Sequence, residues 1–169
     1  KTKQLNSSRI CNRFDVHRWG RSTKTDKPLV LGGITLPDAL SLEAHSDGDV
    51  VLHALCDALL GAVGKGDIGE HFPDTDSAFA GVSSLKLLRQ VWALVVESGL
   101  TLSNLDLTVV AQRPKLAPHR AAMRDGIAKA LGVDAHSINV KATTTEGLGA
   151  IGRGEGIACH AVVLLQPLV

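Results

Sequence analysis

Apolar residues recur at helical spacing in three segments of the chain, and this pattern predicts three helices. The segments are residues 49–63, residues 83–98 and residues 118–131. Ser83 or Ser84 stands where an N-cap is expected, and Gly99 follows the end of that second helix. Pro118 fits the first turn of the third helix, and Gly132 is expected to stop it.

Strands are predicted where apolar residues alternate with polar ones or where β-branched residues gather. They cover residues 9–19, two short pieces around a Gly-Gly turn in 29–36, and residues 105–111, 138–143 and 157–165. This order of elements favours an α/β (α+β) domain in which helices cover one face of a mixed sheet. Neither a repeat nor a linker divides residues 9–169, so we expect one domain. The polar residues 1–8 are expected to lie outside it, as a tag remnant or the tail of a linker or transit segment.

Three polar residues in the first strand and first helix indicate a metal site. Asp15 and His17 lie two apart on the strand, so their side chains point to one face. His53 lies on the helix, on a face that it shares with Asp49 and Asp57. Two imidazoles and one carboxylate with a fourth position open are typical of a catalytic zinc site. The alternative is a satisfied core histidine beside a surface pair, and Asp57 either orients the His53 ring or is a surface carboxylate.

The turn before the first helix carries a second group of candidates. Ser46 is a candidate N-cap, and Asp47 and Asp49 would lie in the first turn, where the helix dipole favours negative charge. His45 has no capping role there, which favours a contact between its ring and an anion or phosphate.

A threonine-rich segment near the end of the chain is a candidate phosphate site. Thr143 and Thr144 lead through Glu146 into a Gly-rich bend, where hydroxyl and backbone N–H groups suit phosphate oxygens. Glu146 suits Mg²⁺ or Mn²⁺ bridging such oxygens. The alternative is an ordinary Thr-rich strand end. Lys115, after Pro114, is either a phosphate contact or a solvated charge.

Composition excludes several classes of partner. The formal net charge is +1 and aromatic residues make up 3% of the chain with no tyrosine, so neither a basic footprint nor stacking platforms for nucleic acid are visible. The three cysteines show no CxxC spacing, which favours a reducing compartment over a disulfide framework. No apolar run approaches the roughly 20 residues of a membrane span. We therefore expect neither nucleic acid nor a membrane as a partner.

Seven segments together resemble the 2-C-methyl-D-erythritol 2,4-cyclodiphosphate synthase family. They are Asp15-Val-His17, the HSDGDVVLH run from His45 to His53, DALLGA from Asp57, GDIG from Gly66, FPDTD from Phe72, AQRPKL from Ala111 and KATTTE from Lys141. The resemblance runs in order from about Arg9 to Leu165. It implies a homotrimer with the sheets toward its centre and active sites between neighbouring subunits. It also implies Zn²⁺ on Asp15, His17 and His53, with Mg²⁺ or Mn²⁺ near Glu146.

The reaction that this resemblance implies is an intramolecular phosphoryl transfer. The substrate would be 4-diphosphocytidyl-2-C-methyl-D-erythritol 2-phosphate, whose own 2-phosphate closes a cyclic diphosphate and expels CMP. His45 and Thr144 would stabilise the transition state. The residues that the resemblance assigns to substrate binding are Ser46, Asp67, Gly69, Phe72, Pro73, Asp74, Thr75, Asp76, Ala111, Pro114, Lys115, Leu116, Ala117, Ala142, Thr143, Glu146 and Arg153.

Three positions depart from the family pattern. The family usually carries glycine where this chain has Cys11 and Arg13, and an aromatic residue where it has Ala150. Bulk before the metal strand would either shift the ligands or point to solvent. Two rival functions are a metal-dependent phosphoesterase with a linear product and a non-catalytic binding trimer with structural zinc. The bacterial cytoplasm is the expected location, with the plastid stroma as the alternative.

Overall fold

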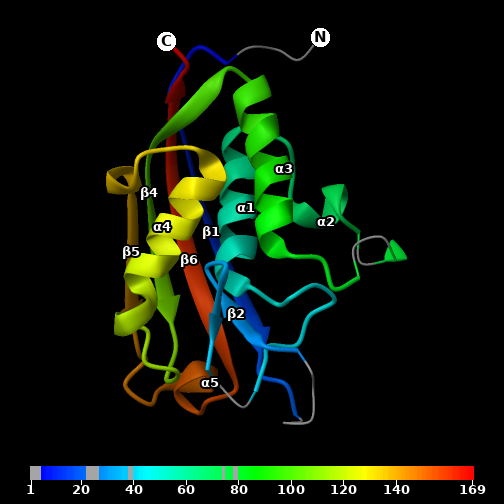
Figure 1. Cartoon of the computed structure of the whole chain (residues 1–169), viewed down its shortest axis with the longest axis vertical. Coiled ribbons are helices and arrows are strands. Elements are labelled where there is room, and N and C mark those ends of the chain that lie inside the picture. The colour runs from blue at the N-terminus through cyan, green and yellow to red at the C-terminus, as the bar shows by residue number, and fades with distance from the viewer. Residues whose placement is uncertain (1–4, 22–26, 38–39, 74, 78–79) are drawn as a thin grey trace.

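Helices pack on one face of a mixed four-stranded sheet in the computed structural model of the chain (Figure 1). The structure describes residues 5–21, 27–37, 40–73, 75–77 and 80–169. The strands are β1 (Arg9–Arg18), β2 (Leu29–Leu31), β3 (Ile34–Leu36), β4 (Leu100–Val110), β5 (Ile138–Thr143) and β6 (Gly156–Pro167). The helices are α1 (Val50–Ala62), α2 (Ile68–His71), α3 (Ser84–Glu97), α4 (Arg120–Leu131) and α5 (Gly149–Gly152), with 3-10 turns η2 (Ala117–His119) and η3 (Ala135–Ser137).

The sheet has the strand order β1-β6-β4-β5. β4 and β5 run parallel and are joined through α4, whereas β6 runs antiparallel to both β1 and β4. α1 lies across β1 and β6, α4 packs on β5, and α3 packs on α1 (Figure 1). Every residue of α1 except Gly61 is buried, so this helix lies between the sheet and α3. The predicted fold class, a mixed sheet with helices on one face, is confirmed.

The side chains of β1 alternate between two different surroundings, as strand geometry requires. The odd-numbered residues face α1: the Arg9 Nε donates to the Ala62 carbonyl over 2.9 Å. The even-numbered residues point away from the helices, and Ile10, Phe14 and Val16 are 72%, 51% and 50% exposed. Val162 on the neighbouring β6 is also exposed. These four residues form an apolar patch on a sheet face that no helix of the described chain covers, and polar residues such as Asp106 and Lys141 occupy the same face on β4 and β5.

Asp49 joins the start of α1 to the turn between β2 and β3. Gly32 and Gly33 hold φ angles of 59° and 77°, the left-handed pair that a tight hairpin turn needs. The Asp49 carboxylate accepts their amide hydrogens at 2.9 and 2.7 Å and caps the helix by accepting from Val51 and Leu52 at 3.1 and 3.0 Å. Burial raises the pKa of Asp49 to about 7, although the amides of Gly33, Leu52 and Gly32 act against the rise.

This arrangement corrects the prediction that Ser46 caps the first helix, because the cap is Asp49. An N-cap must accept from the second and third amides of the helix. Asp49 stands at that distance from Val51 and Leu52, whereas Ser46 lies three residues too early. Asp49 therefore lies at the cap rather than in the first turn.

Other boundaries lie close to the predictions, with a few differences. The third helix is predicted from residue 118, but Pro118 lies in the 3-10 turn η2 and α4 begins at Arg120. β4 begins at Leu100 rather than residue 105, because Leu100 and Leu102 are buried and extend the pairing with β6 past an irregularity after Leu102. The short helices α2 and α5 lie in segments without helical periodicity, which four residues are too few to establish. Ser83 is the N-cap residue of α3, and Gly132 ends α4 with φ 66°, as expected.

No helix among the described residues is long and apolar enough to cross a membrane. The amide of Leu5 donates to the Ser98 carbonyl over 3.0 Å, while residues 1–4 lie outside the described part of the chain. The placement of residues 1–8 outside the domain stays a prediction.

Candidate active site

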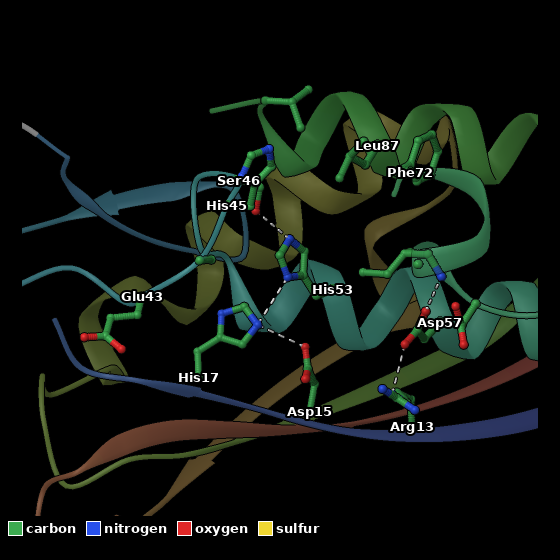
Figure 2. Close-up of a pocket in the computed structure, with 15 residues that line it drawn as sticks. Arg13, Asp15, His17, Glu43, His45, Ser46, His53, Asp57, Phe72 and Leu87 are labelled. Carbon is green, nitrogen blue, oxygen red and sulfur yellow. Dashed lines mark hydrogen bonds and ion pairs between the residues drawn. The ribbon is translucent and has the colours of Figure 1, made fainter. Parts of the chain in front are cut away.

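Asp15, His17 and His53 meet at the end of β1 nearest the start of α1 (Figure 2). Their ligand atoms all lie within 4.8 Å of one another. The His17 Nε2 is 3.3 Å from the Asp15 Oδ2 and 3.3 Å from the His53 Nδ1. The predicted clustering of these three side chains is therefore confirmed.

The orientation of His17 follows from its second ring nitrogen. The His17 Nδ1 lies 3.0 Å from the carbonyl oxygen of Gly48, and a carbonyl can only accept. His17 Nδ1 therefore donates to the Gly48 carbonyl, which leaves Nε2 as the ring nitrogen that faces Asp15 and His53 and is available to a metal. Gly48 has φ 80°, and a Cβ there would lie 2.9 Å from the Leu42 carbonyl, so the turn that supplies this carbonyl requires glycine.

The donor set fits a divalent cation. One carboxylate oxygen and two ring nitrogens converge, and nitrogen with oxygen is a combination that Zn²⁺ accepts. Burial alone would raise the pKa of Asp15, but its contact with His17 and the Val16 amide outweigh burial, so this pKa is lowered. Asp15 is accordingly held as a carboxylate, the form that a metal needs.

A cavity of about 400 Å³ opens beside the three side chains. Of the residues predicted to bind substrate or act in catalysis, those lining it are His45, Ser46, Asp67, Gly69 and Phe72. Asp57, which the sequence offered as an orienting partner of His53, also lines it. Sequence reasoning did not assign the other lining residues to the site; they are Arg13, Glu43, Ala44, Ile68, Val82 and Leu87. The cavity thus joins the metal ligands to the turn before α1 and to α2, where Asp67 caps the helix by accepting from the Glu70 amide.

Arg13 and Asp57 form an ion pair inside this cavity (Figure 2). The Arg13 Nε is 3.0 Å from the Asp57 Oδ2, and Asp57 also accepts from the Ile68 amide at 2.8 Å. Burial raises the pKa of Asp57, while the Ile68 amide and the guanidinium act against the rise. Arg13 therefore lines the cavity through this ion pair, while its side chain stays 47% exposed to solvent. Asp57 thus contacts Arg13 and Ile68. The His53 Nε2 lies next to the hydroxyl groups of Ser46 and Ser84 instead.

The remaining predicted residues form a second group at the ends of β4 and β5. The Ala111 amide donates to the Thr143 carbonyl over 2.9 Å, and the Thr145 amide to the Gln112 side chain over 3.0 Å. This group comprises Ala111, Pro114, Lys115, Leu116, Ala117, Ala142, Thr143, Thr144 and Glu146, with Arg153 after α5. Within the described chain, none of these residues lines the cavity beside the metal ligands. Thr144, Glu146 and Arg153 are exposed.

The segment after Phe72 and the three positions that depart from the family pattern lie in different surroundings. Pro73, Thr75 and Asp76 form a turn in which the Asp76 amide donates to the Pro73 carbonyl over 3.0 Å, and they do not line the cavity; Asp74 lies outside the described residues. Cys11 is half-buried beside Gly61, whose added Cβ would lie 2.6 Å from the Cys11 Sγ. Ala150 is exposed on α5.

Comparison with known proteins assigns the family. The model of the YgbB family matches residues 8–166. The chain belongs to the YgbB family. A curated relative, the 2-C-methyl-D-erythritol 2,4-cyclodiphosphate synthase of Syntrophotalea carbinolica, is 57% identical over 158 residues, which are 94% of this chain and 94% of that protein.

Solved structures of related proteins share the YgbB fold seen here. The bifunctional IspDF from Campylobacter jejuni matches with a TM-score of 0.90 and 47% identity over 97% of this chain, which spans only 43% of that longer chain. The CDP complex of Plasmodium falciparum IspF matches with a TM-score of 0.84 and 34% identity over 98% of this chain and 100% of that one. The family resemblance read from the sequence is therefore confirmed.

Proposed function

We propose that this chain is a 2-C-methyl-D-erythritol 2,4-cyclodiphosphate synthase of non-mevalonate isoprenoid biosynthesis. The observation that carries the proposal is the convergence of Asp15, His17 and His53 beside a cavity, in a chain 57% identical to a protein of that name. The substrate is 4-diphosphocytidyl-2-C-methyl-D-erythritol 2-phosphate, and the products are the cyclodiphosphate and CMP. The enzyme class is accordingly a phosphorus–oxygen lyase.

The reaction needs no nucleophile from the protein. An oxygen of the substrate's 2-phosphate forms a bond to the β-phosphorus, the bond from that phosphorus to the oxygen bridging to the cytidylyl phosphate breaks, and the electron pair leaves with CMP. Catalysis then depends on positioning and on neutralising charge. Asp15, His17 and His53 would hold Zn²⁺, which supplies Lewis-acid stabilisation to a phosphate oxygen when bound. We assign His45, which lines the cavity, to the stabilisation of developing charge.

The second group of residues supports a role on the cytidine side of the substrate. The ends of β4 and β5 lie side by side and present backbone groups around Ala111 and Thr143. A solved relative, Plasmodium falciparum IspF, is described as a CDP complex. We assign Thr144 to transition-state stabilisation and Glu146 to Mg²⁺ or Mn²⁺ between the phosphates. Arg153, already paired with Glu155 over 2.7 Å, is assigned a phosphate contact.

We also propose a homotrimer with active sites between subunits. Two observations support it: the cytidine-side residues do not line the metal cavity of the same chain, and the sheet has an uncovered apolar patch on β1 and β6. A neighbouring subunit would bring the two groups together. Mixing inactive His53→Ala and Thr144→Ala subunits would then restore activity, to about a quarter of wild type for random closed trimers. A mixture that stays inactive would place each site within one subunit.

Phosphorus NMR of the protein with substrate, Zn²⁺ and Mg²⁺ tests the reaction itself. A coupled pair of cyclic diphosphate signals that grows together with CMP is the expected result. A linear phosphate product would instead identify the metal-dependent phosphoesterase. Binding of substrate without turnover would identify the non-catalytic trimer.

We propose the bacterial cytoplasm as the location, because the curated relatives are bacterial proteins. The plastid stroma is the alternative. Fractionation of the source organism followed by immunodetection of the chain distinguishes the two.

A further inference from the structure

The Nε2 ring nitrogen of His53, which does not face His17, lies next to two hydroxyl groups. The His53 Nε2 lies 2.9 Å from the Ser84 Oγ and 3.1 Å from the Ser46 Oγ, the latter contact drawn in Figure 2. Ser84 is the first residue of α3 and is fully buried. Neither serine belongs to the metal ligands, yet both contact the one ligand that comes from a helix.

Asp47 determines which atom donates in the contact between Ser84 and His53. The Ser84 hydroxyl donates to the Asp47 Oδ1 over 2.5 Å. A hydroxyl has one proton to donate, and a carboxylate oxygen only accepts. Since that proton is committed to Asp47, the His53 Nε2 must donate to the Ser84 oxygen. His53 then carries its proton on Nε2, and its Nδ1 keeps a lone pair directed toward His17, 3.3 Å away.

Asp47 is itself held in place from several directions. Its Oδ2 accepts from the Ser84 amide at 2.9 Å, and its Oδ1 accepts from the Asp49 amide at 3.1 Å. The Asp47 amide donates to the Val82 carbonyl over 3.2 Å. These bonds tie the turn before α1 to the start of α3, so the acceptor for the Ser84 proton is rigidly placed.

We propose that Asp47 and Ser84 are positioning residues of the metal centre, which fix the tautomer and ring orientation of His53 so that Nδ1 is the ligand atom. This inference rests on the metal-binding part of the proposed function and not on the cyclisation. Residues that orient metal ligands typically change metal affinity by about 10- to 100-fold when they are removed. Ser84→Ala should weaken zinc binding by that factor while all three ligands remain.

Two measurements on the full chain without substrate test this. Nitrogen NMR of the metal-free protein should show His53 protonated on Nε2, and chelator competition should give the zinc affinity of each variant. Ser83→Ala is the matched control, since Ser83 is exposed, lies beside Ser84 at the same helix start and makes no side-chain cap hydrogen bond. It should bind zinc as the wild type does.

The possible results distinguish a failure of the positioning role from a failure of the proposed function. His53 protonated on Nδ1 in the wild type, or Ser84→Ala with zinc affinity within twofold of wild type, overturns the positioning role. If Ser84→Ala fails to fold, Asp47→Ala removes the acceptor that takes the Ser84 proton and should weaken zinc binding in the same way. A zinc-binding protein that hydrolyses its substrate or turns nothing over contradicts the proposed cyclisation but leaves these results interpretable. A wild type that binds no zinc refutes both.

Discussion

Replacing Asp49 by alanine should destabilise the protein more than any ordinary helix-cap substitution. The carboxylate accepts four backbone N–H groups, two from the turn at Gly32 and Gly33 and two from the start of α1. Asp49 is fully buried, so water does not replace those bonds. Each orphaned buried donor costs about 1–3 kcal/mol. For four donors the loss therefore amounts to roughly 4–12 kcal/mol at a pH where the carboxyl is protonated in the folded state, out of about 5–15 kcal/mol for a whole domain.

Titration of Asp49 opposes part of this loss. The folded pKa of about 7 lies above the ordinary 3.8, so between these pH values the folded state holds a proton that the unfolded state has released. The free energy of unfolding contributed by Asp49 is therefore fully present below about pH 4 and falls as pH rises through about 7. At about 1.4 kcal/mol per pKa unit, the fall is up to about 4 kcal/mol. Asp49→Asn removes the titration while keeping one oxygen acceptor.

Urea unfolding followed by tryptophan fluorescence at pH 5 and pH 8 measures both effects. The difference between wild type and Asp49→Asn should be larger at pH 5 than at pH 8, and Asp49→Ala should lose most stability at pH 5. Taking differences cancels the titration of every group that the variants share. A difference that is the same at both pH values would show that Asp49 does not titrate in this range. A loss below about 1 kcal/mol in Asp49→Ala would refute the assignment of its four amide partners.

Three further changes test other parts of the structure. His53→Ala should abolish zinc binding and activity while circular dichroism stays near wild type; an active, zinc-free variant would contradict the metal assignment. Glu146→Gln should leave zinc bound but weaken the Mg²⁺ or Mn²⁺ dependence of turnover, and an unchanged requirement would make Glu146 structural. Gly61→Ala should cost about 1–3 kcal/mol in urea unfolding because its Cβ would meet the Cys11 sulfur. In a Cys11→Gly background the same change should be neutral or stabilising by up to about 1 kcal/mol, and an equal cost in both backgrounds would exclude this contact.

The metal ligands could be predicted because they obey local periodicities. Asp15 and His17 are two apart on a strand, and spacing alone places them on one face. That His53 meets them depends on α1 crossing β1, which the apolar pattern of the helix made a reasonable expectation. The sequence predicted only that the His53 side chain needs polar partners, because a polar side chain on an apolar helix must be satisfied.

The partners themselves could not be predicted from local sequence. Ser84 and Asp47 are 37 residues apart, and each has an ordinary local explanation as a helix-start residue. Ser46, Asp47 and Asp49 are all residue types that cap helices, and this ambiguity led to the prediction that Ser46 is the N-cap of α1. Only the position of the Gly32 turn beside α1 distinguishes Asp49, since it alone accepts amides from both elements. Arg13 is similar, because its role depends on Asp57 across the cavity.

The alternation along β1 has a consequence for how this chain tolerates change. Its odd positions, Asp15 and His17, belong to the candidate metal site, while its even positions, Phe14 and Val16, belong to the uncovered apolar patch. Inserting or deleting a single residue within β1 would exchange the two sets, because strand side chains alternate strictly. Both the candidate metal site and the apolar patch would be lost in one step. Exposed segments usually accept insertions. β1 should be an exception: although it is half-exposed, it should be among the segments of the chain that tolerate insertions least.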